Sequence, residues 1–315
     1  MAMEPLTETT RIEGYEAVRL RSSSAQLDAT FVPEIGMVGA SLRDRGAELL
    51  YANGGVHRYA LGGSTMGIPL LHPWANRLAG DGYRVNGTAV RLDPASPLVQ
   101  RDDHGLPIHG LLNGSRRWRR RPAPDGWALS AELDFGAHRD LLAAFPFPHR
   151  LRLDVALRRR TLTVRTTLSA EGDHPVPVAF GFHPYLHLPD VPRDRWRVEL
   201  PQMRHLELDA RGIPTGASRP MPAQAFRLGA RTFDDGYADV APGAEFALAG
   251  GARRIMVRLD EGYAVAQVFA PPAGDVICFE PMTAPTNALA SGERLPLVAP
   301  GGRYTATFSI TVESR

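Results

Sequence analysis

Apolar and polar residues alternate with a period of two along several runs of the chain beyond residue 126. Residues 127–133, 151–157 and 304–312 place an apolar side chain at every second position, and residues 162–168 do so with one threonine in the series. Successive side chains of a strand point to opposite faces, so each run predicts a strand with one buried face. The last of these runs predicts a strand that holds the C-terminus in place.

Three further strand-like runs follow one another at residues 254–259, 263–270 and 275–280, while residues 190–250 are rich in Pro, Gly and Asp and predict short strands at best. No long amphipathic helix, repeat or low-complexity segment is evident. Many short strands separated by turn residues predict an all-β fold, an antiparallel sandwich or barrel. No position resembles an interdomain linker, so we expect residues 1–315 to form a single domain.

The segment Gly181–Pro189 is the part of the chain most suggestive of a binding pocket. Read as one strand, it places His183, Tyr185 and His187 on one face and apolar residues on the other. Pro184 has no N–H and a fixed φ, which argues against a helix here. The pattern predicts a pocket wall with a titratable side. The Arg158–Arg160 run is expected to form a solvated hairpin tip.

Composition narrows the possible chemistry. The chain has 315 residues, 43% of them hydrophobic, and a formal net charge of +2, which makes no case for a nucleic-acid or membrane partner. All 36 basic residues are arginines, because the sequence contains no lysine. This excludes a Schiff-base lysine and a Walker A lysine.

Cys278 is the one cysteine, so no internal disulfide or multi-cysteine zinc site can form. Its apolar surroundings predict core packing. On a strand, His183 and His187 would lie about 13 Å apart, too far to bind one metal ion, so we expect no metal and no cofactor. The N-terminus lacks the features of a signal peptide, and no apolar run reaches the roughly 18 residues of a membrane span, so we expect a cytoplasmic protein.

Several other residues are candidates for chemistry. Glu280 ends a predicted apolar strand directly before a proline, Arg77 lies in a proline-shaped loop, and His109 precedes a glycine. Asp234 and Asp235 lie in a predicted turn, where aspartate is common for its local hydrogen bonds. Each residue alone is a weak signal, and an ordinary structural role is the alternative for every one of them.

Four sequence blocks together make a more specific pattern: Pro73–Leu78, Ile108–Gly110, Gly181–Tyr185, and Phe279–Thr283 with Asn287–Leu289. A fifth, weaker block is Phe233–Tyr237. In this order, across about residues 65–290, they resemble the aldose 1-epimerase (mutarotase) superfamily. The resemblance implies a large antiparallel β-sandwich with the active site in a cleft on one sheet.

The resemblance also implies roles for single residues. It assigns acid–base catalysis to Glu280 and His183, and contacts with the sugar to Arg77, His109, Asp234, Asn76 and Tyr185. Asp235 remains an alternative to Asp234, and Trp74 an alternative to Tyr185 for stacking on the sugar. Leu111 and His72 depart from the family's usual pattern, which leaves the exact sugar open.

The hypothesis is that Glu280 acts as base and His183 as acid while the ring of an aldohexose opens and closes on the other face. Positioned proton transfer contributes roughly 10²–10⁴-fold to a rate. The expected partner is a small sugar, with no nucleic acid or membrane. Two alternatives stay open, a hexose-6-phosphate 1-epimerase and a carbohydrate-binding module without turnover. The oligomeric state and the roles of His72, His104 and His187 also stay open.

Overall fold

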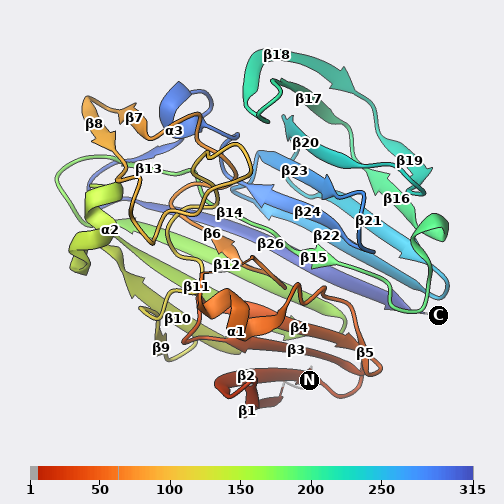
Figure 1. Cartoon of the computed structure of the whole chain (residues 1–315). Helices are drawn as coiled ribbons and strands as arrows, with labels where there is room; N and C mark the ends of the chain where they lie inside the picture. Colours follow the sequence, from red (N-terminus) through yellow and green to blue (C-terminus); the bar gives the residue numbers. More distant parts are fainter. Residues whose placement is uncertain (1–5, 63, 315) are drawn as a thin grey trace.

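The computed structural model describes residues 6–62 and 64–314, and about half of them belong to strands of antiparallel β-sheets (Figure 1). One sheet has nine strands, a second has eight and a third, near the N-terminus, has five. Two small ribbons complete the strands, formed by Gly82–Val85 (β7) with Thr88–Arg91 (β8) and by Val176–Pro177 (β13) with Leu297–Val298 (β25).

The nine-stranded sheet contains the runs whose alternation is clearest in the sequence. Its strands, in spatial order, are Gln224–Arg227 (β19), Arg197–Leu200 (β16), Ala244–Gly250 (β21), Arg253–Glu261 (β22), Arg303–Ser314 (β26), Thr161–Ala170 (β12), His149–Arg158 (β11), Leu129–Asp134 (β10) and Arg119–Arg121 (β9). The strands predicted at residues 151–157, 162–168 and 304–312 are confirmed as β11, β12 and β26. In β26, every second side chain from Ala306 to Val312 is fully buried.

The eight-stranded sheet contains three of the predicted site residues, Asp234, Tyr185 and Glu280. Its strands, in spatial order, are Pro214–Met221 (β18), Met203–Leu208 (β17), Phe233–Ala238 (β20), Val265–Ala270 (β23), Ile277–Met282 (β24), Gly181–Phe182 (β14) and Leu70–Leu71 (β6), and Tyr185–Leu186 (β15) also pairs with β24. The predicted runs at 254–259, 263–270 and 275–280 correspond to β22, β23 and β24.

The two large sheets pack face to face through aromatic side chains. Phe182 on β14 meets Phe308 on β26 with ring centroids 5.0 Å apart, and Phe246 on β21 meets Phe279 on β24 at 5.6 Å. All four rings belong to one cluster of buried apolar side chains, the main core. The fold is therefore the antiparallel sandwich predicted from the sequence.

The five-stranded sheet lies beside this sandwich, toward the N-terminal end of the chain (Figure 1). Its strands are Leu6–Ile12 (β1), Tyr15–Ser22 (β2), Leu27–Val32 (β3), Val38–Asp44 (β4) and Ala47–Glu48 (β5). Apolar side chains from β2, β3 and β4 join the main core.

Helices are few and short. They are Gly55–Ala60 (α1), Arg139–Ala144 (α2) and Ala288–Ser291 (α3), with 3₁₀ turns at Phe135–Ala137 and Arg193–Arg195. Across the described residues, α1 and α2 are the longest helices at six residues each, and no helix has the length and apolar character needed to cross a membrane.

The region between residues 190 and 250 is where the strand prediction is wrong. It contains six strands, and one of them, β18, has eight residues. Most β18 side chains are exposed, so no alternation marks the strand in the sequence. Both β18 and β19 end their sheets and pair on one side only. Edge strands tolerate proline, glycine and polar residues, which explains why this composition predicted short strands at best.

The Arg158–Arg160 tip requires a second correction. The hairpin between β11 and β12 forms as predicted, but Arg160 is not a solvated side chain. It donates to the Oδ1 of Asp44 at 2.7 Å, and Arg253 donates to the Oδ2 at 3.0 Å. Asp44 is fully buried, and burial alone would raise its pKa, but the two guanidinium groups lower it. The tip therefore ties the five-stranded sheet to the nine-stranded one.

Candidate active site

Glu280 lies on the face of the eight-stranded sheet that points away from the sandwich core. Phe279, its neighbour in β24, packs into the core, so the alternation of the strand turns Glu280 to the opposite side. The prediction that Glu280 ends its strand is wrong, because β24 continues to Met282. Its cross-strand neighbour on β23 is Gln267, and both residues are buried at 1% and 2% exposure.

His183 reaches the same face from a break between two short strands. The segment predicted as one strand is split into β14 and β15, with His183 and Pro184 between them. Proline cannot donate to a strand ladder, which accounts for the interruption. Tyr185 pairs with Cys278 on β24, so its side chain points to the same face as Glu280. Cys278 is fully buried, as predicted, and burial raises the pKa of its thiol.

The two predicted catalytic side chains lie against one another. Nε2 of His183 is 3.2 Å from Oε1 of Glu280, and the side chains are 6% and 2% exposed. Burial raises the pKa of Glu280 well above 4.5, and the charge of Asp234 adds to this rise. Burial lowers the pKa of His183 well below 6.5, helped by the nearby His109. Both shifts favour uncharged groups.

Three aromatic rings surround His183. Tyr185 stacks on it with centroids 4.2 Å apart and planes 10° from parallel. His109 and Phe269 meet it edge-on at 5.4 Å and 5.8 Å. Burial and then the charge of Arg77 lower the pKa of His109 to about 3, so this imidazole is neutral at physiological pH. The surroundings fix the imidazole of His183 from several sides.

Arg77 is held by charged and polar partners. Its Nε donates to Oδ2 of Asp102 at 2.7 Å, one terminal nitrogen donates to Oδ1 of Asn76 at 3.2 Å, and the other donates to Oδ2 of Asp234 at 3.2 Å. Burial alone would lower the pKa of Arg77, but the carboxylates of Asp234 and Asp102 raise it. The guanidinium is therefore ionised and fixed in orientation.

Backbone contacts bring the loops of this site together. His109 N–H donates to the carbonyl of Asn76 at 2.9 Å, and both residues have positive φ values, 63° and 54°. Gly110, with φ of +73°, lies against the backbone of His72, where an added Cβ would be 2.2 Å from a carbonyl oxygen. Only glycine fits there, which gives the His-Gly pair a structural reason.

Asp234 and Asp235 point to opposite faces of β20, so the turn predicted for them is wrong. Strand pairing with β17 and β23 overrides the local Asp-Asp-Gly signal. Asp234 contacts Arg77 and accepts a hydrogen bond from Gln267 at 2.7 Å. Asp235 instead pairs with His205 at 2.9 Å. Only Asp234 joins the predicted site residues.

Two polar residues of the site, Gln267 and Asp102, were missed in the sequence. Gln267 gave a usable signal, since it is a polar residue inside the apolar run Val265–Ala270. Asp102 gave none, because an aspartate in a loop is ordinary. Its side chain is 7% exposed and also accepts the backbone N–H groups of His104 and Leu106, both at 2.9 Å.

The three histidines left open lie apart from the acid–base pair. His72 is buried and its Nε2 is 2.8 Å from Nε2 of His149, among phenylalanines. His104 is exposed. His187 is half-buried beside Tyr51, with ring centroids 6.3 Å apart.

The exposed fraction of the side chain falls from Asp234 through Arg77 to Glu280. The side chain of Asp234 is 42% exposed, that of Arg77 is 16% and that of Glu280 is 2%. Solvent therefore reaches the site from the Asp234 side. The arrangement offers fixed charged and amide groups at the outer end and an uncharged acid–base pair at the inner end. A polyhydroxylated ligand suits the outer groups, and proton exchange suits the inner ones.

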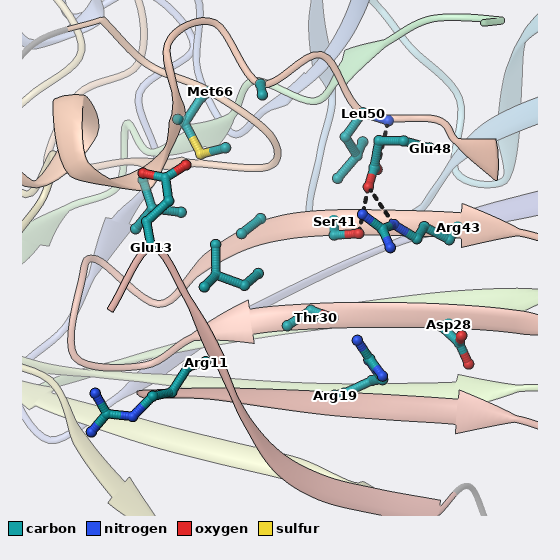
Figure 2. Close-up of a pocket in the computed structure, with 15 residues that line it drawn as sticks. Arg11, Glu13, Arg19, Asp28, Thr30, Ser41, Arg43, Glu48, Leu50 and Met66 are labelled. Carbon is teal, nitrogen blue, oxygen red and sulfur yellow. Dashed lines mark hydrogen bonds and ion pairs between the residues drawn. The ribbon is translucent and has the colours of Figure 1, made fainter. Parts of the chain in front are cut away.

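A separate hollow of about 340 Å³ lies on the outer face of the five-stranded sheet (Figure 2), and none of the predicted site residues lines it. Its charged side chains have partners in the protein. Glu48 accepts hydrogen bonds from Ser41 and Arg43, and Glu13 accepts the backbone N–H of His57. Paired groups of this kind do not call for a ligand.

No metal-binding group of three or more His, Cys, Asp or Glu side chains occurs among residues 6–62 and 64–314.

Comparison with known proteins agrees with the resemblance read from the sequence. A family model described as aldose 1-epimerase matches residues 32–311. The uncharacterized protein YihR of Escherichia coli K12 is 26% identical over 262 residues, covering 77% of this chain and 80% of that protein.

Solved structures share the fold. A galactose mutarotase-like protein from Clostridium acetobutylicum superposes with a TM-score of 0.82 at 15% identity, covering 99% of each chain. The Slr1438 protein from Synechocystis has a TM-score of 0.77 at 22% identity, covering 100% of this chain and 98% of that one. Galactose 1-epimerase from Lactobacillus acidophilus has a TM-score of 0.74 at 15% identity, with 98% and 99% covered. From its sequence and its fold, this chain belongs to the aldose 1-epimerase family.

Proposed function

We propose that this protein is an aldose 1-epimerase that interconverts the α and β anomers of a free aldohexose. The observation that carries the proposal is the buried contact of 3.2 Å between His183 and Glu280. Anomer exchange requires that a proton leave the hydroxyl on the anomeric carbon and that another reach the ring oxygen. One base and one acid, side by side and shielded from water, suit this requirement.

The pair works when it holds one proton between its two members. Glu280 as carboxylate takes the proton of the anomeric hydroxyl, His183 as imidazolium protonates the ring oxygen, and the ring opens to the aldehyde. After rotation about the C1–C2 bond, the hydroxyl formed from the ring oxygen attacks the other face of the aldehyde. His183 takes back the proton of this hydroxyl, and Glu280 returns its proton to the aldehyde oxygen. The neutral tautomer, with the proton on Glu280, contains the same number of protons. Burial, which moves the pKa of each group toward its uncharged form, therefore favours this one-proton state.

The outer residues would bind the sugar hydroxyls. Arg77 and Asp234 supply donors and acceptors of fixed orientation, and Gln267 and Asn76 add amide groups. Because His109 is neutral, it can hydrogen-bond a hydroxyl without competing as an acid. Hydrogen bonds to charged groups are worth about 1.5–3 kcal/mol each, enough to hold the ring against the pair.

The charge balance supports a free sugar over a phosphorylated one. The guanidinium of Arg77 is already neutralised by Asp102 and Asp234, with the Asp234 carboxylate nearest the solvent. A phosphate dianion would need unpaired donors, and it would meet a carboxylate first. The hexose-6-phosphate alternative therefore has no supporting contact in this set of residues.

Polarimetry tests the proposal. Fresh α-D-glucose and α-D-galactose should lose optical rotation faster with the protein than without it, and glucose 6-phosphate should neither react nor compete. Glu280→Gln is the matched control, because it keeps the shape and removes the base. Turnover of glucose 6-phosphate alone would favour the phosphosugar alternative. Sugar binding by the wild type with no acceleration for any sugar would favour a binding module.

A further inference from the structure

Tyr185 occupies an unexpected position for a residue predicted to stack on sugar. One face of its ring lies against His183, 4.2 Å away, and the residue is only 7% exposed. Val276 and Cys278 pack with it in a small apolar cluster. The ring is thus enclosed by protein, and its face lies against the imidazole of the acid–base pair.

The hydroxyl of Tyr185 is tied to the N-terminal part of the chain. It lies 2.5 Å from Oγ1 of Thr65, in a buried hydrogen bond between residues 120 positions apart. Thr65 is 6% exposed, and its carbonyl accepts a hydrogen bond from the side chain of Asn53 at 2.9 Å. The tyrosine ring therefore cannot turn or tilt freely.

The same segment holds the backbone of Tyr185. Tyr51 N–H donates to the carbonyl of Tyr185 at 2.9 Å, and Tyr185 N–H donates to the carbonyl of Gly67 at 2.8 Å. Gly67 N–H also donates to the carbonyl of Tyr51 at 3.3 Å, so the two residues that bond to the backbone of Tyr185 are bonded to each other. Tyr51, Thr65 and Gly67 thus hold Tyr185 by both of its backbone groups and by its hydroxyl.

His183 depends on this support because its second ring nitrogen has no hydrogen bond to a described residue that would orient the imidazole. In many active sites, a hydrogen bond at one ring nitrogen sets the orientation and tautomer of a histidine. Here Nε2 of His183 faces Glu280, and Nδ1 has no hydrogen-bond partner among the described residues. The plane of the imidazole is then fixed by ring contacts, and the stacked ring of Tyr185 is the nearest of the three.

Building on the function proposed above, we propose that Thr65 and Tyr185 are positioning residues for His183. Thr65 anchors the hydroxyl of Tyr185, Tyr185 holds the imidazole plane by stacking, and Nε2 of His183 is thereby kept at Glu280. Neither residue touches the sugar. The role assigned to Tyr185 changes from binding the substrate to orienting the proposed acid.

The test is a double-mutant cycle with Thr65→Val and Tyr185→Phe, each measured for kcat and KM by polarimetry. Both changes remove one end of the hydrogen bond and keep the stack. Each single variant should lower kcat roughly tenfold, the worth of about one hydrogen bond, and leave KM within about twofold. Because both remove the same interaction, the double variant should be no slower than either single variant.

Matched controls separate positioning from general loss of stability. Tyr83→Phe removes another buried tyrosine hydroxyl, which donates to the carbonyl of Ala144 at 2.6 Å, and Thr30→Val removes a buried hydroxyl on β3. Both should keep the wild-type kcat. A rise in KM with unchanged kcat in Tyr185→Phe would show that Tyr185 binds the sugar, and additive losses in the cycle would show independent roles. Either result would overturn the proposal.

A second readout does not depend on turnover. The ¹⁵N resonances of the His183 imidazole, assigned with His183→Gln, should shift in Thr65→Val and stay unchanged in Thr30→Val. If the wild type turns over no sugar but these resonances shift, the proposed function fails while the positioning role stands. Unchanged His183 resonances in Thr65→Val would overturn the positioning role.

Discussion

The two ends of the candidate site respond to burial in opposite ways. At the inner end, burial raises the pKa of Glu280 and lowers that of His183, so the uncharged form of each group is favoured. At the outer end, facing charges outweigh burial, so the pKa of Arg77 rises and that of Asp102 falls. Residues of one sheet face and its loops thus include both a neutral pair and a charged network.

The difference lies in the partners available to each group. Arg77 has two carboxylates and an amide within hydrogen-bond distance, so its charge is retained and its orientation is fixed. Glu280 has one neighbouring imidazole, and its second oxygen has no hydrogen-bond partner in the described part of the chain. A fixed charge suits binding, and a group close to losing or gaining a proton suits catalysis. The comparison predicts effects on KM at one end and on kcat at the other.

The largest effect is expected at the inner end. Glu280→Gln removes the proposed base and keeps its size, so kcat should fall by roughly 10²–10⁴-fold, the usual contribution of positioned proton transfer. KM should change little, because the outer network is intact. Initial rates of rotation change over a range of sugar concentrations give both constants. A variant that keeps more than a tenth of the wild-type kcat would remove Glu280 from the mechanism.

The next effect is expected at the outer end. Arg77→Lys keeps the positive charge but loses the fork of donors, so KM should rise about 10- to 100-fold, matching one lost hydrogen bond to a charged group. kcat should change less. Arg117→Lys is the matched control, because Arg117 pairs with the exposed Asp140 and not with a predicted site residue. A large loss of kcat at unchanged KM would contradict the assignment of sugar binding to the outer end and catalysis to the inner end.

Stability should change in opposite directions at the two ends. The raised pKa of Glu280 means that its contribution to stability is lost as pH rises above 4.5, so Glu280→Gln should stabilise the fold at pH 8 and matter little near pH 4. The lowered pKa of Asp102 means that its contribution is present above 3.8 and is lost below it. Asp102→Asn should therefore destabilise at pH 8.

Each change in the free energy of unfolding should be about 1–3 kcal/mol at pH 8, the cost of one buried polar group or charged hydrogen bond. Urea unfolding of both variants at pH 4 and pH 8 measures it. Changes of the same sign at pH 8 would show that the two ends do not differ in the way proposed.

The smallest effects distinguish two neighbouring aspartates. Asp234→Asn weakens the contacts with Arg77 and Gln267, so KM should rise several-fold. Asp235→Asn affects a pair with His205 on the other face of β20, so KM should stay within about twofold of the wild type. Kinetics of the two variants side by side decide between these aspartates, and a larger effect at Asp235 would reverse the assignment.

Much of the fold was predictable because alternation is a local property. The strands β11, β12 and β26 can be recognised in the sequence, because they place a buried side chain at every second position. The exposed edge strand β18 has no such pattern, and its pairing with β17 is decided by the rest of the sheet. For the same reason, the Asp-Asp-Gly signal failed to predict that Asp234 lies in a strand.

Site residues that belong to short sequence motifs could be predicted, whereas contacts between residues far apart in the sequence could not. Arg77, His109, His183 and Glu280 were found from motifs, and the structure brings them together. Asp102 meets Arg77 across 25 positions and Thr65 meets Tyr185 across 120, and nothing local marks either pair. Gln267 could have been found, because a polar residue buried in an apolar strand needs a partner.

The pH dependence of kcat/KM between about pH 3 and pH 10 tests the central claim most directly. If Glu280 and His183 work as a pair that holds one proton, the two limbs belong to the pair. The acid limb, where a second proton is added, should have its midpoint well below 6.5, and the alkaline limb, where the one proton is lost, well above 4.5. No acid limb should therefore appear near pH 6.5. An acid limb with its midpoint near 6.5 would mean that His183 titrates as a free histidine, which would contradict the buried pair.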